Sequence, residues 1–276
     1  MIKNKILLLV LVINSSAFCQ EGTLCPKTEK FFKGLTVVKR TEWGARVPIT
    51  KENITEADKI KGAGPITEYS DYGLKGAPAY TRVILHNTAM MYEDKNTYGT
   101  QPKGCGNKQA KYIQDYEMDE HDIKADTGYN FFIDRCGTIY EGRSLSYFPS
   151  HTGSTVEENK KEDLTLDPDY GSIGVALIDH SNEPLTIQQI EAAEKLITFT
   201  INCYDVNKVI THAEVKSQLE DGTLLGQKLT LESYSVVDPK VCPGSGTIDQ
   251  IITIRKYFND NFSIPFDEDA YRKLFQ

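Results

Sequence analysis

The stretch Thr81-Arg82-Val83-Ile84-Leu85-His86 consists mainly of apolar and β-branched residues, and it predicts a buried strand. Working outward from it, the sequence predicts further strands at residues 172–179 and 208–211, and a hairpin of strands 129–133 and 138–141 around a turn at 134–137. Helices are predicted at residues 107–118 and 248–258, and a third helix is capped by Thr186 and ends near Cys203. Strands that alternate with helices favour an α/β fold with helices packed on a sheet.

The first nineteen residues resemble a secretory signal peptide. Lys3 and Lys5 form a basic start, residues 6–13 are an apolar run, and small residues follow. Eight apolar residues are too few to span a bilayer, which takes about 20. We therefore predict cleavage after Cys19 and a secreted or periplasmic protein; lipid attachment at Cys19 is the less favoured alternative, because Phe18 precedes it.

The composition excludes several classes of protein. The 276 residues carry 31 Lys+Arg and 39 Asp+Glu, so the net charge is −8, and loss of two signal-peptide lysines makes it 29 − 39 = −10. Such an acidic chain is unsuited to non-specific nucleic-acid binding. A hydrophobic content of 39% argues against disorder. We expect a single domain with insertions, a monomer, and no membrane span.

His86 and His212 each follow or close a predicted strand, and Cys242 lies in Val241-Cys242-Pro243-Gly244. Two imidazoles and one thiolate are a suitable ligand set for zinc that leaves a fourth position for water. The mature chain has an odd number of cysteines, so one remains after pairing, either as a buried free thiol or as a metal ligand. Spacing alone is weak evidence, because a histidine at a strand end is more often simply a hydrogen-bonded polar residue.

Short motifs then occur in a fixed order along the chain: Thr41-Glu42-Trp43-Gly44-Ala45-Arg46, Val83-Ile84-Leu85-His86-Asn87-Thr88-Ala89, Gly128-Tyr129-Asn130-Phe131, Gly137-Thr138-Ile139-Tyr140-Glu141-Gly142-Arg143, His151-Thr152-Gly153, Ser172-Ile173-Gly174-Val175-Ala176, His212-Ala213-Glu214-Val215 and Cys242-Pro243-Gly244. Together they resemble the zinc-dependent N-acetylmuramoyl-L-alanine amidase family, which includes peptidoglycan recognition proteins and phage amidase lysozymes. The resemblance covers about residues 36–258.

The resemblance implies a mixed central β-sheet flanked by α-helices and an activity that cleaves the amide between muramic acid and L-alanine. His86, His212 and Cys242 match the family's zinc ligands, and Tyr129 matches its catalytic tyrosine. Lys240 resembles a lysine of the phage enzymes. The implied partner is peptidoglycan or its muropeptides, and the implied cofactor is Zn²⁺.

Several of these residues have an ordinary structural interpretation as well. Tyr129 could be a core aromatic residue, and Lys240 could be a solvated loop charge. His151 could be a loop histidine, although its Thr-Gly context resembles a substrate-groove position. Arg143 either pairs with Glu141 at the hairpin end or faces a peptide carboxylate of the substrate.

Two further residues near the predicted site leave similar alternatives. Glu214 either supports the loop of His212 or is solvated. Trp43 is expected in the core, because a large aromatic side chain beside Gly44-Ala45 is a sound packing unit.

The chain departs from the family pattern in three places. About 40 residues separate Arg46 from His86, and residues 216–240 form an excursion between two ligands. The family's close cysteine pair before the first helix is missing, and we predict a Cys105–Cys136 disulfide instead. The expected organisation is a signal peptide, an N-terminal extension, an amidase domain with insertions near 47–80 and 216–240, and a C-terminal tail, at residues 1–19, 20–35, 36–258 and 259–276.

Two other functions compete with the amidase interpretation. A recognition protein would bind peptidoglycan without cutting it, but non-catalytic family members typically lose the cysteine ligand, which is present here as Cys242. A zinc hydrolase could also use the same ligands on a different amide.

Overall fold

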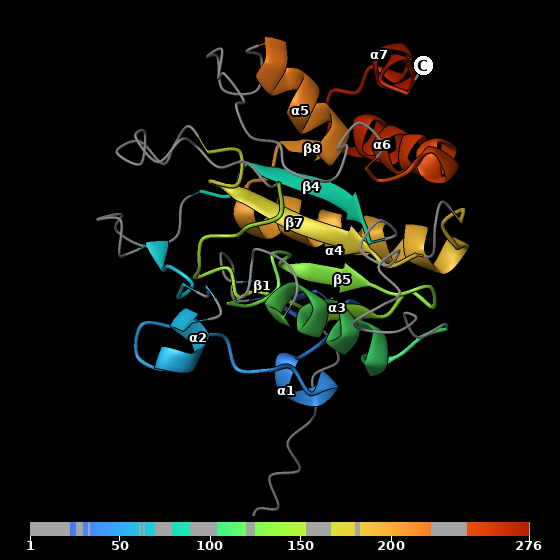
Figure 1. Cartoon of the computed structure of the whole chain (residues 1–276). Helices are drawn as coiled ribbons and strands as arrows, with labels where there is room; N and C mark the ends of the chain where they lie inside the picture. Colours follow the sequence, from blue (N-terminus) through green and yellow to red (C-terminus); the bar gives the residue numbers. More distant parts are fainter. Residues whose placement is uncertain are drawn as a thin grey trace, which may run out of the picture.

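The chain folds around a six-stranded sheet made of β3 (Val37–Val38), β4 (Arg82–Asn87), β5 (Phe131–Ile133), β6 (Ile139–Glu141), β7 (Ser172–Leu177) and β8 (Lys208–Thr211). The computed structural model describes residues 23–25, 30–32, 34–60, 62, 64–69, 79–88, 104–119, 125–152, 167–179, 183–221 and 242–275. The strand order is β3-β6-β5-β7-β4-β8 (Figure 1). β5 and β6 are antiparallel, whereas the other neighbours run parallel, so the sheet is mixed as expected.

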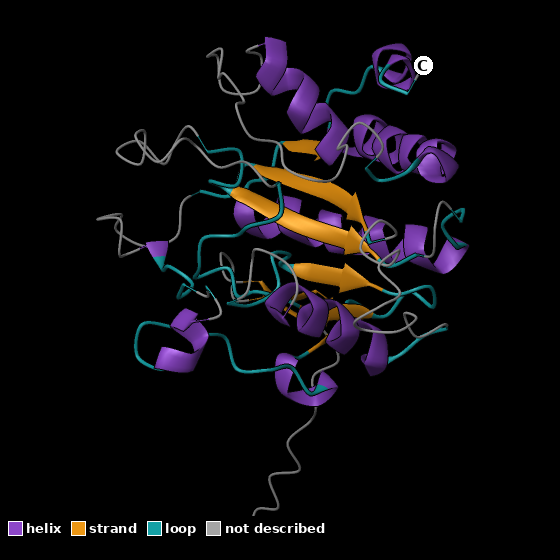
Figure 2. Ribbon diagram, viewed as in Figure 1, coloured by secondary structure: helices purple, strands orange, loops and turns teal. Residues whose placement is uncertain are grey.

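Helices cover both faces of this sheet: α1 (Arg40–Trp43), α2 (Glu56–Ile60), α3 (Asn107–Asp119), α4 (Ile187–Tyr204), α5 (His212–Asp221), the 3₁₀ turn η6 (Ser245–Thr247), α6 (Ile248–Phe262) and α7 (Glu268–Lys273). Figure 2 shows α3 in front of the strands and α4 behind them. Among the described residues, none of these helices is long and apolar enough to cross a bilayer.

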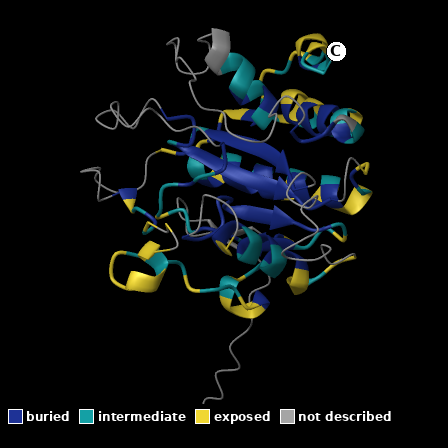
Figure 3. Ribbon diagram, in the orientation of Figure 1, coloured by how far each residue is buried: buried dark blue, intermediate teal, exposed yellow. Residues whose placement is uncertain are grey.

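Two apolar cores lie on opposite faces of the sheet. Val83 and Leu85 of β4 belong to the larger core, under α4 and α6. Trp43 of α1 is 3% exposed and belongs to the smaller core with Ile113 of α3. Because side chains alternate along a strand, His86 faces the side of α1 and α3. All six residues of β4 are buried, as expected for a parallel strand between two helical layers (Figure 3).

Local sequence explains the predicted start of α4 and the predicted turn between β5 and β6. Thr186 caps α4, accepting a hydrogen bond from the Gln189 amide while the Gln189 side chain accepts one from the Thr186 amide, each at 3.1 Å. The Asp134 carboxylate accepts hydrogen bonds from the amides of Cys136 and Thr138 and so shapes the hairpin turn. The predicted Cys105–Cys136 disulfide is confirmed, with a Cα–Cα distance of 5.8 Å. Cys203 is also disulfide-bonded.

Other segments have more structure than the sequence indicated. β1 (Thr23–Cys25) and β2 (Lys30–Phe32) form an antiparallel pair in the N-terminal extension. The first part of the 216–240 excursion continues α5 to Asp221. Residues 259–276, set apart as a tail, complete α6 and form α7, and Tyr271 of α7 is 2% exposed within the larger core. The predicted signal peptide, Cys19 and Lys240 lie outside the described residues.

Candidate metal centre

Three predicted metal ligands from distant parts of the chain meet at the carboxyl ends of β4 and β8. The ligand atoms of His86, His212 and Cys242 all lie within 4.8 Å of one another. Nδ1 of His86 is 3.9 Å from Sγ of Cys242. The structure therefore brings together the three residues that the sequence singled out.

The parallel register of β4 and β8 places the two histidines side by side. Leu85 lies opposite Thr211, so the residues that follow them, His86 and His212, are neighbours with ring centroids 4.9 Å apart. Nε2 of His212 is 2.8 Å from the carbonyl oxygen of Thr152. Because a carbonyl oxygen can only accept a hydrogen bond, Nε2 of His212 carries the proton and Nδ1 retains the lone pair that a metal would use.

Cys242 is held in the turn before η6 by contacts with both histidine-bearing elements. The Ala213 amide in α5 donates to the carbonyl oxygen of Cys242 at 3.1 Å. The Asn87 side chain in β4 donates to the carbonyl oxygen of Pro243, and the Thr247 hydroxyl donates to the same oxygen. The thiol is therefore fixed relative to the strand end and helix start that carry the two imidazoles.

Burial controls the protonation of all three residues. It lowers the pKa of His86 well below its usual range, and His212 and His151 lower it further. Burial also lowers the pKa of His212 and raises the pKa of the Cys242 thiol to about 12. Neutral imidazoles have the lone pairs that a metal needs, and the thiol must release its proton when a metal binds. Two imidazole nitrogens and one sulfur are a donor set that fits zinc.

Tyr129 packs directly against this cluster. It precedes β5, is 9% exposed, and belongs to the smaller core, with its ring centroid 6.0 Å from that of Phe132. Its ring centroid is also 5.1 Å from that of His86. Tyr129 is therefore a core residue that also contacts one of the three predicted ligands, His86.

His151 lies beneath the metal ligands rather than on an open surface. Its side chain is fully buried, with Nδ1 3.1 Å from Nε2 of His86 and 3.2 Å from Asp169 Oδ1. Nε2 of His151 is 3.1 Å from the hydroxyl of Ser172. A Cβ atom on Gly174 would come within 2.8 Å of Nε2 of His151, so the absence of a side chain at Gly174 makes room for this ring.

If His86 binds a metal through Nδ1, its Nε2 carries a proton and donates a hydrogen bond to Nδ1 of His151, which also lies 3.2 Å from Asp169 Oδ1. His151 then carries its own proton on Nε2, facing Ser172, and the Ser172 hydroxyl donates to the carbonyl oxygen of Asp169 at 2.7 Å. The arrangement therefore fixes the ring orientation of His86 from the side away from the thiol.

Arg143 is buried, at 5% exposure, under the segment that leads to Tyr129. Its guanidinium donates to the carbonyl oxygens of Thr127 and Phe148, at 2.8 and 2.7 Å. Glu141, considered as its partner, instead faces Lys39 and accepts a hydrogen bond from the amide of Arg40. Arg143 thus holds two loops together.

The sequence interpretation missed one buried carboxyl group in this region. Glu117 of α3 is 1% exposed and accepts a hydrogen bond from the Gly128 amide, next to Tyr129. Burial raises the pKa of Glu117 to about 8. The available signal was its spacing, because Glu117 is four residues after the core residue Ile113 and so lies on the buried face of the helix.

The chain is similar to known proteins over most of its length. A family model described as N-acetylmuramoyl-L-alanine amidase matches residues 76–245, more than half of the chain. Peptidoglycan-recognition protein SC2 of Drosophila simulans is 28% identical over 251 residues, which cover 91% of this chain and 96% of that protein.

Two solved structures are also similar to this chain. Drosophila peptidoglycan recognition protein SD has a TM-score of 0.44 and 20% identity, covering 74% of this chain and 99% of that one. The N-acetylmuramoyl-L-alanine amidase LysC from Clostridium intestinale has a TM-score of 0.43 and 20% identity, covering 78% and 99%.

Proposed function

The chain belongs to the N-acetylmuramoyl-L-alanine amidase family, and from this premise we propose that it is an exported zinc-dependent amidase. Its substrate would be the amide bond between N-acetylmuramic acid and L-alanine in peptidoglycan or its muropeptides. The observation that carries the proposal is the cluster of buried His86, half-buried His212 and buried Cys242, with ligand atoms within 4.8 Å, in which the Tyr129 ring packs against His86. When bound, zinc would supply the Lewis acid that activates water and polarises an amide carbonyl.

Each neighbouring residue has a specific task in this proposal. His86, His212 and Cys242 hold the metal. Tyr129 places a phenol donor where negative charge develops on the carbonyl oxygen, and such donors typically contribute 10²- to 10³-fold to the rate. Lys240 would add a positive charge beside the same oxygen.

His151 and Arg143, predicted as substrate contacts, are assigned a supporting task in view of their burial. His151 orients His86 through its 3.1 Å contact with Nε2. Arg143 holds the loop before Tyr129 by donating to the carbonyl oxygen of Thr127. A direct contact between Arg143 and a stem-peptide carboxylate would require its guanidinium to leave these buried carbonyl oxygens.

A recognition protein that binds peptidoglycan without cutting it is the second candidate. It is favoured by the names of the relatives, which are peptidoglycan-recognition proteins. The presence of the thiol ligand favours cleavage, because binding alone does not need a metal with an open position.

The deciding experiment incubates purified protein with defined muropeptides, with added zinc and with a chelator, and analyses the products by mass spectrometry. The proposal expects intact stem peptide to be released from muramic acid only with zinc, and Cys242→Ser to release none. Muropeptide binding without any cleavage would refute the amidase proposal and support recognition. Cleavage of a different amide would refute the substrate assignment alone.

A further inference from the structure

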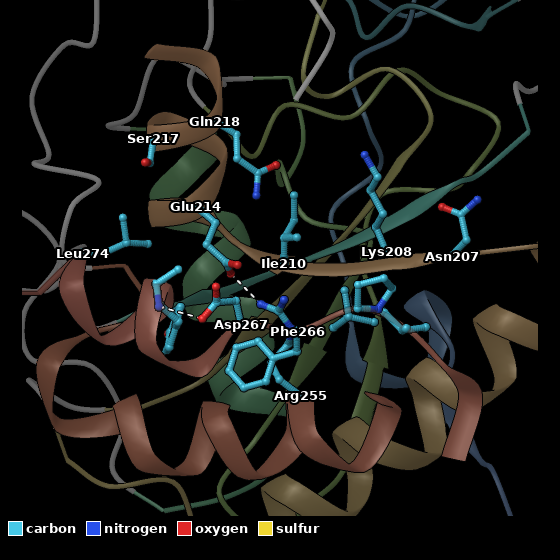
Figure 4. A pocket seen from close by; sticks show the side chains of 15 residues that line it. Asn207, Lys208, Ile210, Glu214, Ser217, Gln218, Arg255, Phe266, Asp267 and Leu274 are labelled. Atoms are coloured by element: carbon cyan, nitrogen blue, oxygen red, sulfur yellow. Dashed lines mark hydrogen bonds and ion pairs between the residues drawn. The ribbon is translucent and has the colours of Figure 1, made fainter. Parts of the chain in front are cut away.

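A cavity of about 830 Å³ lies at the β8 edge of the sheet, between α5 and the C-terminal segment with α7 (Figure 4). At its floor, Glu214 of α5 and Arg255 of α6 form an ion pair at 2.6 Å, and the ring of Phe266 lies beside Arg255. The matched family region ends at residue 245, so Arg255 and Phe266 lie beyond it.

The Glu214 side chain hydrogen-bonds to Thr211, the residue immediately before the proposed metal ligand His212. Oε2 of Glu214 accepts hydrogen bonds from the amide of Thr211 at 2.8 Å and from its hydroxyl at 3.0 Å. Thr211 and Glu214 are three residues apart at the start of α5, which is the spacing of a capping box. His212 and Ala213 lie inside this box, and the Ala213 amide donates to the carbonyl oxygen of Cys242. Moving the box would therefore shift two metal ligands together.

Arg255 holds Glu214 in place. The same Oε2 atom accepts a hydrogen bond from Nη1 of Arg255 at 2.6 Å, and the side chains of Arg255 and Glu214 are only 4% and 12% exposed. A charge pair so poorly hydrated cannot exchange its partner for water without a large penalty. Glu214 therefore remains at Thr211 rather than turning towards solvent.

The C-terminal segment covers this ion pair. The guanidinium carbon of Arg255 is 4.5 Å from the centroid of the Phe266 ring, a cation–π contact. Tyr271 of α7 is 2% exposed and lines the same cavity. α7 is itself tied to α6 by ion pairs between Lys256 and Glu268 and between Arg272 and Asp249.

We propose that Glu214 and Arg255, covered by residues 264–275, form a positioning unit that sets His212 for zinc binding. The inference rests on the proposed metal site. The unit touches neither substrate nor metal, and it acts by fixing the Thr211–Glu214 turn from which His212 projects. Removal of contacts of this kind commonly weakens metal binding by about 10- to 100-fold.

The test measures the zinc dissociation constant of the full chain by competition with a chromophoric chelator, alongside the absorption spectrum of the Co²⁺-loaded protein. We expect Glu214→Gln and Arg255→Met to weaken zinc binding by about 10- to 100-fold and to alter the Co²⁺ bands. Arg255→Lys keeps the charge without the planar fork, and an intermediate loss is expected. Lys59→Ala is the control for loss of an exposed ion pair: Lys59 pairs with Glu56 in α2 at 52% side-chain exposure and has no part in this unit, so its loss should leave the zinc constant within about twofold.

Arg255→Met leaves the Glu214 charge buried and could prevent folding, so the double variant Glu214→Gln/Arg255→Met is measured as well. It removes both charges and should fold, as judged by circular dichroism, yet still bind zinc weakly. Zinc constants and Co²⁺ spectra equal to wild type in Glu214→Gln and the double variant would overturn this inference alone. A wild-type protein that binds no zinc would overturn the proposed function and the inference together.

Discussion

Two buried polar clusters contact the segment around Tyr129, and they satisfy their polar groups in different ways. The scaffold cluster consists of Arg40, Gln114, Glu117, Asp126 and Arg143. Within it, Asp126 Oδ1 accepts from Arg40 at 2.9 Å and from Gln114 at 2.7 Å. The metal cluster consists of His86, His212 and Cys242, whose neutral donor atoms converge within 4.8 Å.

This difference indicates a structural role for the scaffold cluster and a metal-binding role for the metal cluster. In the scaffold cluster the side chains of Arg40, Gln114 and Arg143 donate to buried acceptors, so its polar groups largely hydrogen-bond to one another and to the backbone. In the metal cluster, contacts such as those from Thr152 and His151 occupy the Nε2 atoms, which leaves the Nδ1 atoms and the thiol facing one another. We expect scaffold substitutions to change stability and metal-cluster substitutions to change metal binding or rate.

The largest expected effect is a loss of folding stability caused by a substitution in the scaffold cluster. Arg143→Met removes the donor for two buried carbonyl oxygens and the positive charge that faces Glu117 and Asp126. Breaking a buried charge network in this way should lower the free energy of unfolding by about 3–5 kcal/mol. Urea denaturation followed by circular dichroism would measure it, and a loss below about 1 kcal/mol would contradict a scaffold role.

Tyr129→Phe separates the packing role of the Tyr129 ring from the proposed catalytic role of its hydroxyl. The substitution keeps the ring that packs on His86 and Phe132 and removes only the hydroxyl. If the hydroxyl stabilises the oxyanion, kcat for muropeptide cleavage should fall by about 10²- to 10³-fold. The zinc dissociation constant and the stability should stay near wild type. An unchanged kcat would leave Tyr129 as a core residue only.

Gly174→Ala adds one methyl group beside His151, the residue that contacts Nε2 of the metal ligand His86. The added Cβ would press on the ring of His151, which must then move away from Nε2 of His86. We expect zinc binding to weaken by about 10- to 100-fold. Gly64→Ala is the matched control, because a Cβ there meets nothing within 4 Å. Equal zinc constants for the two variants would show that His151 does not hold His86.

The sequence predicted those parts of the fold that local patterns encode. The apolar run of β4 and the capping residue Thr186 lie in one continuous stretch each, so periodicity and capping chemistry were sufficient. His86, His212 and Cys242 were predicted by their residue types together with the ordered motifs. The family resemblance, not spacing, made that prediction specific.

The remaining features depend on contacts between distant segments. The pair of Glu214 and Arg255 joins residues 41 positions apart, and nothing local to either residue indicates the other. His151 gave a groove-like signal from its Thr-Gly neighbours, but its burial follows from the space left by Gly174 in β7. The C-terminal residues looked like a tail because α7 is only six residues long, and its burial comes from packing on α6.

Glu117→Gln gives the finest test of the comparison, because its effect on stability depends on pH and so reports the charge state of one buried scaffold group. Thr127, the Gly128 amide and Arg143 favour its charged form and Asp126 opposes it, yet burial dominates and raises its pKa from 4.5 to about 8. The folded protein therefore keeps this proton up to about pH 8, whereas the unfolded chain releases it near pH 4.5. Between these values the unfolded state binds fewer protons, so this group makes stability fall as pH rises, by up to about 1.4 kcal/mol per unit.

Glu117→Gln should remove that slope, so the variant should gain stability relative to wild type between pH 5 and 8, with no further gain above about pH 8. Urea denaturation at several pH values measures the difference, and Glu191→Gln, on an exposed position of α4, is the control for loss of a glutamate charge. A difference that does not change with pH would mean that Glu117 is ionised in the fold. The positive charge of Arg143 would then stabilise the Glu117 carboxylate, in addition to the hydrogen bond from the Gly128 amide.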